Sequence, residues 1–222
     1  MKPRTAFALL ILTTSTFTGG FCSAESNPTV LLIGDSHSVG AFGKTLDSLL
    51  RSDPSREVRT VASCGSIIRW FYTGTSTPCG FLKIDASGKM TETLKAPTPL
   101  LSGLLSEKKP DLIIVELGAN YMVGYPDATL VRDTEQLLQD IDSTGAKCLW
   151  VSPPDSRKYR EERKLLVARL EKLVSARCQW FDSLQFTRYP DTGGDGVHYS
   201  TSSMIPIAKE WASQVYKVIE SL

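Results

Sequence analysis

The stretch TVLLIGDSHSVG, residues 29–40, joins a continuous apolar run to a short polar segment. The apolar part, residues 29–34, reads as a strand buried on both faces, because its apolar residues do not alternate with polar ones. From Val39 to Leu50, apolar side chains recur at helical spacing. A buried strand followed directly by a helix is the repeating unit of parallel sheets. Ser36 therefore stands just beyond the carboxyl end of a predicted buried strand.

The same pattern continues along the chain. Further apolar runs read as strands at residues 57–63, 111–118, 146–152 and 178–183. Helical patterns follow the first strand over residues 37–52 and recur at residues 127–145, 158–176 and about 201–220. This alternation predicts an α/β fold, a flavodoxin-like α/β/α arrangement around a five-stranded parallel sheet. Ligands of such sheets bind beyond the carboxyl ends of the strands.

Residues 65–99 interrupt this rhythm. They are rich in Gly, Thr, Ser and aromatic residues, and they read as a long insertion after the second strand. A loop of that length in a compact domain is usually functional or disordered. The chain shows no internal repeat and no low-complexity linker, so residues 25–222 are expected to form one domain that contains this insertion.

The first 24 residues are a different kind of sequence. Lys2 and Arg4 precede a short apolar stretch, and small residues follow near its end. These features predict an export signal that is cleaved after Ala24 and leaves a periplasmic or secreted protein. A lipid anchor on Cys22 is the alternative, and the large aromatic residue before this cysteine fits it poorly.

Charge and hydropathy exclude two classes of partner. Removal of the signal leaves 23 basic and 24 acidic residues, a net charge of −1. A chain without excess positive charge is not expected to bind nucleic acid. The apolar stretch near the N-terminus is too short to span a bilayer comfortably, so no stable membrane insertion is expected.

The cysteines indicate an oxidising compartment. Four remain after cleavage, and an even number in an exported chain predicts disulfides. Cys64 and Cys79 would close a short loop at the start of the insertion. Cys148 and Cys178 begin two strands, and neighbouring strands lie within the distance that a disulfide spans. No cysteine pair has the CxxC spacing of zinc sites, and the chain has two histidines, so we expect neither a metal nor another cofactor.

A serine nucleophile requires a base, a group that orients the base, and hydrogen-bond donors for an oxyanion. His37 follows Ser36 directly, and adjacent side chains at a helix start do not face each other. That leaves His198 as the candidate base. Asp195 precedes His198 by three residues in a loop-like stretch, where its carboxylate can accept from Nδ1 of the imidazole.

Donors for the oxyanion follow three of the predicted strands. The helix that begins near Ser36 offers backbone N–H groups and a partial positive charge. Gly65 follows the second strand and can turn its N–H toward the same place without a side chain in the way. Asn120 follows the third strand and adds a side-chain amide. The residues around Ser36 lack the second glycine of the G-x-S-x-G elbow, which excludes the usual α/β-hydrolase turn.

These motifs occur in a recognisable order: GDS with Ser36, then Gly65, GAN with Asn120, and D-x-x-H with Asp195 and His198. The set resembles the SGNH hydrolases, also called GDSL-type esterases, over nearly the whole mature chain. The resemblance implies a flavodoxin-like fold and ester hydrolysis through an acyl-serine intermediate. By position, the nucleophile would be Ser36 and the base would be His198, oriented by Asp195. The oxyanion hole would combine Ser36, Gly65 and Asn120.

The first motif reads GDSHS rather than GDSL, as in the SGNH subgroup that acts on acetylated sugars and in related acetyltransferase domains. This form favours removal of small acyl groups, especially acetyl, from a carbohydrate or a cell-envelope glycan. Aromatic residues near the motifs are candidates for substrate binding, namely Trp70, Tyr72, Tyr121 and Tyr199. A sugar O-acetyltransferase, a lipase or thioesterase, and a catalytically silent binding domain remain alternatives.

Overall fold

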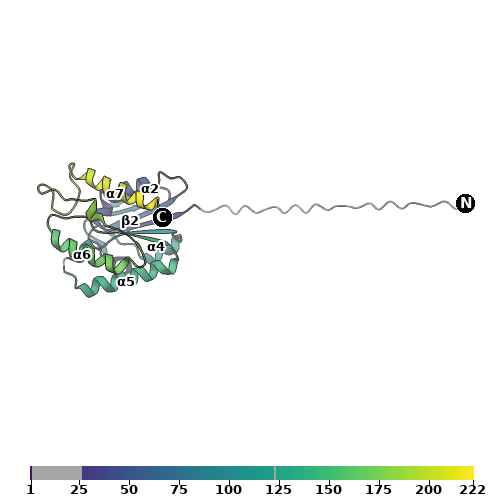
Figure 1. Cartoon of the computed structure of the whole chain (residues 1–222), viewed down its shortest axis with the longest axis horizontal. Helices are drawn as coiled ribbons and strands as arrows, with labels where there is room; N and C mark the ends of the chain where they lie inside the picture. Colours follow the sequence, from purple (N-terminus) through teal and green to yellow (C-terminus); the bar gives the residue numbers. More distant parts are fainter. Residues whose placement is uncertain (2–26, 123) are drawn as a thin grey trace.

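The structure, a computed structural model, describes residue 1, residues 27–122 and residues 124–222. The predicted signal and Cys22 lie outside the described part. The centre is a seven-stranded sheet with the strand order β5-β4-β2-β1-β7-β8-β9 (Figure 1). Its strands are β1 (Thr29–Gly34), β2 (Glu57–Ser63), β4 (Phe81–Ile84), β5 (Met90–Thr93), β7 (Leu112–Glu116), β8 (Lys147–Val151) and β9 (Gln179–Phe181).

Five of these strands, β2, β1, β7, β8 and β9, are parallel and coincide with the five predicted runs. The predicted count of five strands is wrong, because the insertion adds β4 antiparallel to β2 and β5 antiparallel to β4. β5 reads Met-Thr-Glu-Thr and is exposed along its whole length, so no apolar pattern marks it as a strand. The insertion also forms a second, two-stranded sheet of β3 (Ser76–Thr77) and β6 (Ala96–Pro97).

Helices cover both faces of the sheet. They are α1 (Ser36–Val39), α2 (Ala41–Leu50), α3 (Trp70–Thr73), α4 (Leu101–Glu107), α5 (Asp127–Thr144), α6 (Arg160–Val174) and α7 (Ile205–Ile219), with the short 3-10 helices η1 (Ala119–Met122) and η2 (Ser183–Gln185). α2 and α7 lie on one face, and α4, α5 and α6 lie on the other (Figure 1). None of the helices in the described ranges is both long and apolar enough to cross a membrane.

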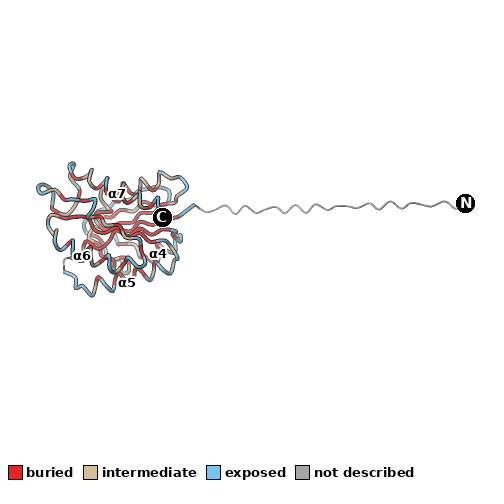
Figure 2. Tube along the Cα trace, viewed as in Figure 1, coloured by how far each residue is buried: buried red, intermediate tan, exposed pale blue. Residues whose placement is uncertain are grey.

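The central strands are buried on both sides (Figure 2). Along β1, Leu31 and Ile33 pack into the core beneath α4, α5 and α6. Val30 and Leu32 pack into the core beneath α2 and α7. Because successive side chains of a strand point to opposite faces, one unbroken apolar run contributes to both cores.

The chain turns sharply where β1 ends. A Cβ atom at Gly34 would lie 2.1 Å from the Ser38 hydroxyl oxygen, so only glycine lets α1 fold back against the strand. Asp35 caps α1, because its side chain accepts from the His37 N–H at 3.0 Å. The single helix predicted over residues 37–52 is two helices, α1 and α2, separated at Gly40.

Both predicted disulfides are present. Cys64, directly after β2, is bonded to Cys79 in the insertion, with 5.5 Å between the Cα atoms. Cys148 in β8 is bonded to Cys178, directly before β9, with 4.6 Å between the Cα atoms. The first disulfide lies at the carboxyl end of β2, and the second lies near the amino ends of β8 and β9. The two disulfides are therefore at opposite ends of the parallel strands.

Candidate active site

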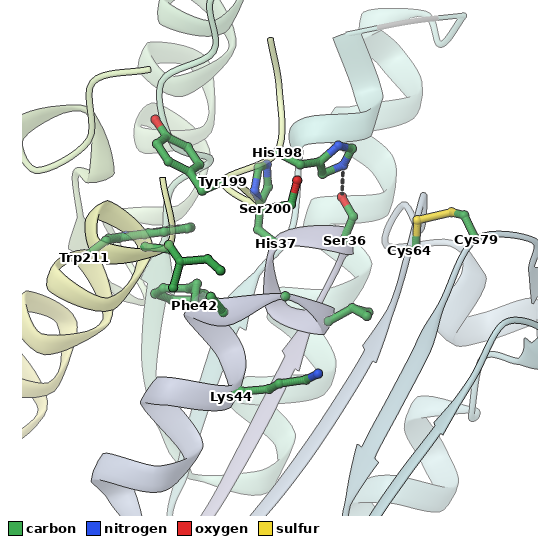
Figure 3. A pocket seen from close by; sticks show the side chains of 15 residues that line it. Ser36, His37, Phe42, Lys44, Cys64, Cys79, His198, Tyr199, Ser200 and Trp211 are labelled. Atoms are coloured by element: carbon green, nitrogen blue, oxygen red, sulfur yellow. Dashed lines mark hydrogen bonds between the residues drawn. A yellow bond between two sulfur atoms is a disulfide. The ribbon is translucent and has the colours of Figure 1, made fainter. Parts of the chain in front are cut away.

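Ser36, His198 and Asp195 form one hydrogen-bonded line. His198 Nε2 lies 3.0 Å from the Ser36 hydroxyl oxygen, although 162 residues separate the two in the chain (Figure 3). His198 Nδ1 lies 2.6 Å from Asp195 Oδ2. The carboxylate can accept only from a protonated Nδ1, which leaves Nε2 as an acceptor for the serine proton. The arrangement is that of a nucleophile, its base and the group that orients the base.

A tight turn holds the carboxylate in place. Asp195 Oδ1 accepts from the backbone N–H groups of Val197 and His198 at 2.8 and 2.7 Å. Partial burial opposes ionisation, but the hydrogen bonds from the His198 ring and from these two N–H groups lower the pKa of Asp195 well below its ordinary range. The side chains of His198 and Asp195 remain 38% and 53% exposed. Asp195 is therefore a carboxylate at all moderate pH values, in contact with solvent.

Tyr189 stabilises this turn through hydrogen bonds of its hydroxyl group, and the sequence did not single it out. It is fully buried, and its hydroxyl donates to the His198 carbonyl at 3.2 Å. The same oxygen accepts from the Gly196 N–H at 3.1 Å and lies 3.4 Å from Asp195 Oδ1. The only signal in the sequence is an aromatic residue shortly before a glycine-rich loop, which is too common to identify it.

A layer of buried polar side chains lies next to Ser36. Asp35 and Glu116 are both fully buried. Glu116 Oε2 accepts from the Ser38 hydroxyl at 2.8 Å, and the Asp35 N–H donates to the Glu116 carbonyl at 3.1 Å. Burial raises the pKa of Asp35 to about 6. Burial, together with the neighbouring Asp35 carboxylate, raises the pKa of Glu116 well above its ordinary range.

Two further ionisable groups complete this layer. Arg163 of α6 is 1% exposed, and its Nε and Nη1 atoms have no hydrogen-bond partner among the described residues. Burial lowers the pKa of Arg163, whereas Asp35 and Glu116 raise it. His37 is also buried, and burial together with the Arg163 charge lowers its pKa well below the ordinary value. His37 is therefore neutral, unlike a residue that would carry a proton during catalysis.

The candidate oxyanion donors come from segments that meet near Asp35, because the Asn120 amide contacts both Asp35 and Ser66, the residue after Gly65. In the described part of the chain, the N–H groups of Ser36 and Gly65 donate to no protein acceptor. Gly65 has φ +80°, a backbone conformation that side chains disfavour. The Asn120 amide donates to the Ser66 carbonyl at 2.9 Å, which fixes its orientation, and makes only a long contact of 3.4 Å with Asp35 Oδ2. A ligand would compete for the second amide hydrogen with this long contact alone.

Solved structures with this arrangement of strands and helices are known. No family model and no curated protein sequence matches the chain. A candidate SGNH hydrolase from Slackia heliotrinireducens superimposes with a TM-score of 0.58 at 16% identity, over 85% of this chain and 98% of that one. An acetyl xylan esterase superimposes with a TM-score of 0.58 at 14% identity, over 84% and 99%. A peptidoglycan O-acetylesterase gives 0.54 at 12% identity, over 89% and 93%.

The chain has the SGNH-hydrolase fold. Identities this low establish the fold alone, so the roles of individual residues depend on the geometry of this chain. In this SGNH fold, the parallel strands β1, β2 and β7 are followed by Ser36, Gly65 and Asn120. Asp195 and His198 lie in the loop before α7, and the antiparallel β4–β5 extension lies beyond β2 at one edge of the sheet.

A pocket of about 590 Å³ opens beside the Ser36 hydroxyl of this SGNH fold (Figure 3). Its lining comes from α1, α2, α7, the Cys64–Cys79 disulfide and the residues around His198. The rings of Phe42 and Trp211 stack at 3.6 Å between centroids and lie in its wall. His37 also lines the pocket, with its ring centroid 5.5 Å from that of His198.

The four aromatic candidates occupy different places. Tyr199 lines the pocket, and its hydroxyl donates to the Asp155 carbonyl at 2.9 Å. Trp70 lies against Gly65, since a Cβ atom there would be 3.7 Å from its ring. The hydroxyls of Tyr72 and Tyr121 donate to carboxylates of α5, at 2.7 Å and 2.9 Å, away from the pocket. Tyr72 and Tyr121 therefore fasten the insertion and η1 to α5.

Proposed function

We propose that this protein is an exported serine esterase that removes small acyl groups, acetyl in particular, from a carbohydrate or a cell-envelope glycan. The observation that carries the proposal is the line of hydrogen bonds from Asp195 through His198 to Ser36, with 2.6 and 3.0 Å between the paired atoms. The N–H groups of Ser36 and Gly65 have no protein acceptor in the described residues and are available as oxyanion donors. A serine with an oriented base and an oxyanion site is equipped for acyl transfer.

Acylation begins at Ser36. Its hydroxyl oxygen attacks the ester carbonyl carbon, while its proton passes to His198 Nε2. The carbonyl π electrons move to the oxygen, and the resulting oxyanion accepts hydrogen bonds from the Ser36 and Gly65 N–H groups and the Asn120 amide. The tetrahedral intermediate then collapses, the bond to the alcohol oxygen breaks, and the imidazolium of His198 returns its proton to the leaving alcohol.

Deacylation repeats these steps with water as the nucleophile. Water gives a proton to His198 Nε2 and adds to the acyl carbon, and the Ser36 oxygen leaves and recovers the proton. Asp195 stays ionised throughout, because its pKa lies well below its ordinary range. The exposure of the His198 and Asp195 side chains supports water over a second sugar as the acceptor, because a transferase must keep water from its acyl-serine.

Three further observations support the substrate class and the location. The names of the acetyl xylan esterase and the peptidoglycan O-acetylesterase indicate acetylated glycans as their substrates, and both proteins superimpose over most of this chain. The GDSHS form of the first motif favours the same substrates. Two disulfides suit an exported protein, because thiols of most cytosolic proteins stay reduced.

Release of acetate tests this function. Purified protein is incubated with acetylated xylan, with O-acetylated peptidoglycan and with a nitrophenyl ester series from acetate to decanoate, and Ser36→Ala serves as the inactive control. We expect acetate from at least one glycan and the highest activity on the shortest esters. A preference for long acyl chains would favour a lipase or thioesterase. Transfer of most acetyl groups to an added glycan acceptor would favour the acetyltransferase.

A further inference from the structure

We infer that the pocket beside Ser36 binds the alcohol part of the ester, and that this part is a sugar ring. The inference rests on the proposed function, because it assigns His198 the role of proton donor to the leaving alcohol. It adds which side of the site holds the sugar and which residues select it. The acyl group would then lie outside this pocket.

Two oxygen atoms of the ester show which part of the substrate the pocket holds: the leaving oxygen, which takes up a proton, and the carbonyl oxygen, which takes up negative charge. The leaving oxygen must approach His198 Nε2, from which it takes its proton. The carbonyl oxygen must instead face Gly65 and Asn120, which donate to it. His198, Tyr199 and Ser200 line the pocket, whereas neither Gly65 nor Asn120 is among its lining residues. The pocket therefore opens on the leaving-group side of Ser36.

The walls of the pocket suit a ring with an apolar face and polar edges. Val39, Ala41 and Ile205 are half-buried apolar residues in the wall. Ser200 and Lys44 add polar groups, and the Lys44 ammonium pairs with Glu92, so its charge is already balanced. A sugar ring presents C–H groups on its faces and hydroxyls around its edge, and it matches this mixture better than a hydrocarbon chain does.

His37 favours a hydroxylated occupant further. It lines the pocket as a neutral imidazole, and its Nε2 has no hydrogen-bond partner among the described residues. This nitrogen is shielded from the pocket in the structure, so a ligand hydroxyl can pair with it only if the ring turns toward the pocket. The volume of about 590 Å³ lies within the range of small-molecule sites and leaves room for a ring with its substituents.

Filling the pocket separates the alcohol side from the acyl side. Ala41→Trp is compared with wild type on acetyl and butyryl esters of two alcohols, ethanol and a methyl hexoside. Kcat/KM for the hexoside esters should fall by roughly tenfold or more, mainly through KM, while the ethyl esters change by less than about twofold. Lys44→Trp, at an exposed position of the same wall, provides a second blocking variant.

Control experiments separate a wrong assignment of the pocket from a wrong assignment of the esterase function. Ala128→Trp places the same side chain on the exposed face of α5 and should leave all four rates unchanged. Cyclohexyl acetate tests the sugar itself, and wild type should prefer the hexoside acetate. The pocket is not the alcohol site if folded Ala41→Trp and Lys44→Trp lose more activity on butyryl than on acetyl esters. It is not the alcohol site either if they lose activity equally on all four esters. If cyclohexyl acetate is hydrolysed equally well, the occupant is not a sugar. A wild-type protein inactive on every ester would overturn the function instead.

Discussion

Asp195 and Asp35 are two carboxyl groups near Ser36 that differ in exposure and in pKa. Asp195 lies in an exposed turn, and the hydrogen bonds it accepts lower its pKa well below the ordinary range. Asp35 is fully buried, and burial raises its pKa to about 6. The same functional group is thus kept ionised at Asp195 and is driven toward its neutral form at Asp35.

The difference separates two tasks. We propose that the exposed turn serves proton transfer, because its carboxylate is hydrogen-bonded to the His198 ring that faces the Ser36 hydroxyl. The buried layer fixes positions, because Asp35 caps the helix that carries Ser36 and lies 3.4 Å from the Asn120 amide. We therefore expect changes in the exposed turn to act on rate, and changes in the buried layer to act on stability and its dependence on pH.

Ser36→Ala and His198→Ala should have the largest effect. Each removes a group that acts only together with the other, so each should lower kcat by about 10⁵–10⁶. Steady-state kinetics measure this on a nitrophenyl acetate, and the thermal midpoint should stay close to that of wild type. Ser48→Ala, an exposed serine on α2, is the matched control and should keep full activity. A folded Ser36→Ala protein with wild-type kcat would remove the exposed turn from the mechanism.

Asn120→Ala tests the side-chain donor of the proposed oxyanion site. The amide is expected to stabilise the oxyanion only as it forms, so kcat should fall by about 10²–10³ with little change in KM. The comparison is made on the same ester as above. A rise in KM at unchanged kcat would mean that Asn120 binds the ground state and takes no part in the oxyanion site.

The two disulfides should differ in their effect on activity. Cys64–Cys79 lines the pocket and precedes Gly65, whereas Cys148–Cys178 lies near the amino ends of β8 and β9. Replacing either pair by alanine should cost roughly 3–4 kcal/mol of unfolding free energy. Loss of the first pair should also lower kcat/KM by a few-fold, and loss of the second should leave it unchanged. Equal effects on kcat/KM would contradict this assignment.

Glu116→Gln should have the smallest effect on rate and a clear effect on pH dependence. The pKa of Asp35 is about 6 in the folded protein and near 3.8 when unfolded, so its contribution to stability is present below pH 3.8 and is lost as the pH rises to 6. Glu116 acts in the same direction. Glutamine keeps a polar partner for Ser38 and does not titrate. The loss of unfolding free energy between pH 4 and 7 should shrink by on the order of 1–3 kcal/mol.

Denaturant unfolding at pH 4, 5, 6 and 7 measures this effect. Glu162→Gln, at an exposed position of α6, is the matched control and should reproduce the wild-type curve. Asp195→Asn should give a curve parallel to that of wild type over this range, since the stability from a lowered pKa is present above pH 3.8 and is lost only on further acidification. A Glu116→Gln curve parallel to that of wild type would show that the buried pair does not titrate with folding.

The same contrast explains what could be predicted from the sequence. The five parallel strands and the pairing of the cysteines followed from apolar runs and strand ends, which depend on local pattern. Asp195 and His198 stood out because the chain has only two histidines and His37 directly follows Ser36, and because their D-x-x-H spacing completes the set of motifs. The placement of these residues relative to Ser36 depends on the whole topology, which the order of the motifs along the chain indicated only through a resemblance.

The buried layer could not be predicted in this way. Glu116 stands in an apolar strand, and Arg163 belongs to a helix full of charged residues, so neither sequence context marks a buried charge near Asp35. β5 was missed because an exposed edge strand needs no apolar pattern. Tyr72 and Tyr121 were predicted at the site because they follow its motifs, but their hydroxyls reach α5. Proximity in sequence did not indicate the direction of these side chains.

Ser36 is proposed to become covalently acylated with help from the exposed His198–Asp195 pair. Labelling with a fluorophosphonate, followed by peptide mass spectrometry, tests it most directly, because the reagent forms a stable bond with an activated serine. We expect one adduct per chain, on the peptide that contains Ser36, with loss of esterase activity in parallel and at least 100-fold slower labelling of His198→Ala. An adduct on another residue, or full esterase activity in fully labelled protein, would contradict the account.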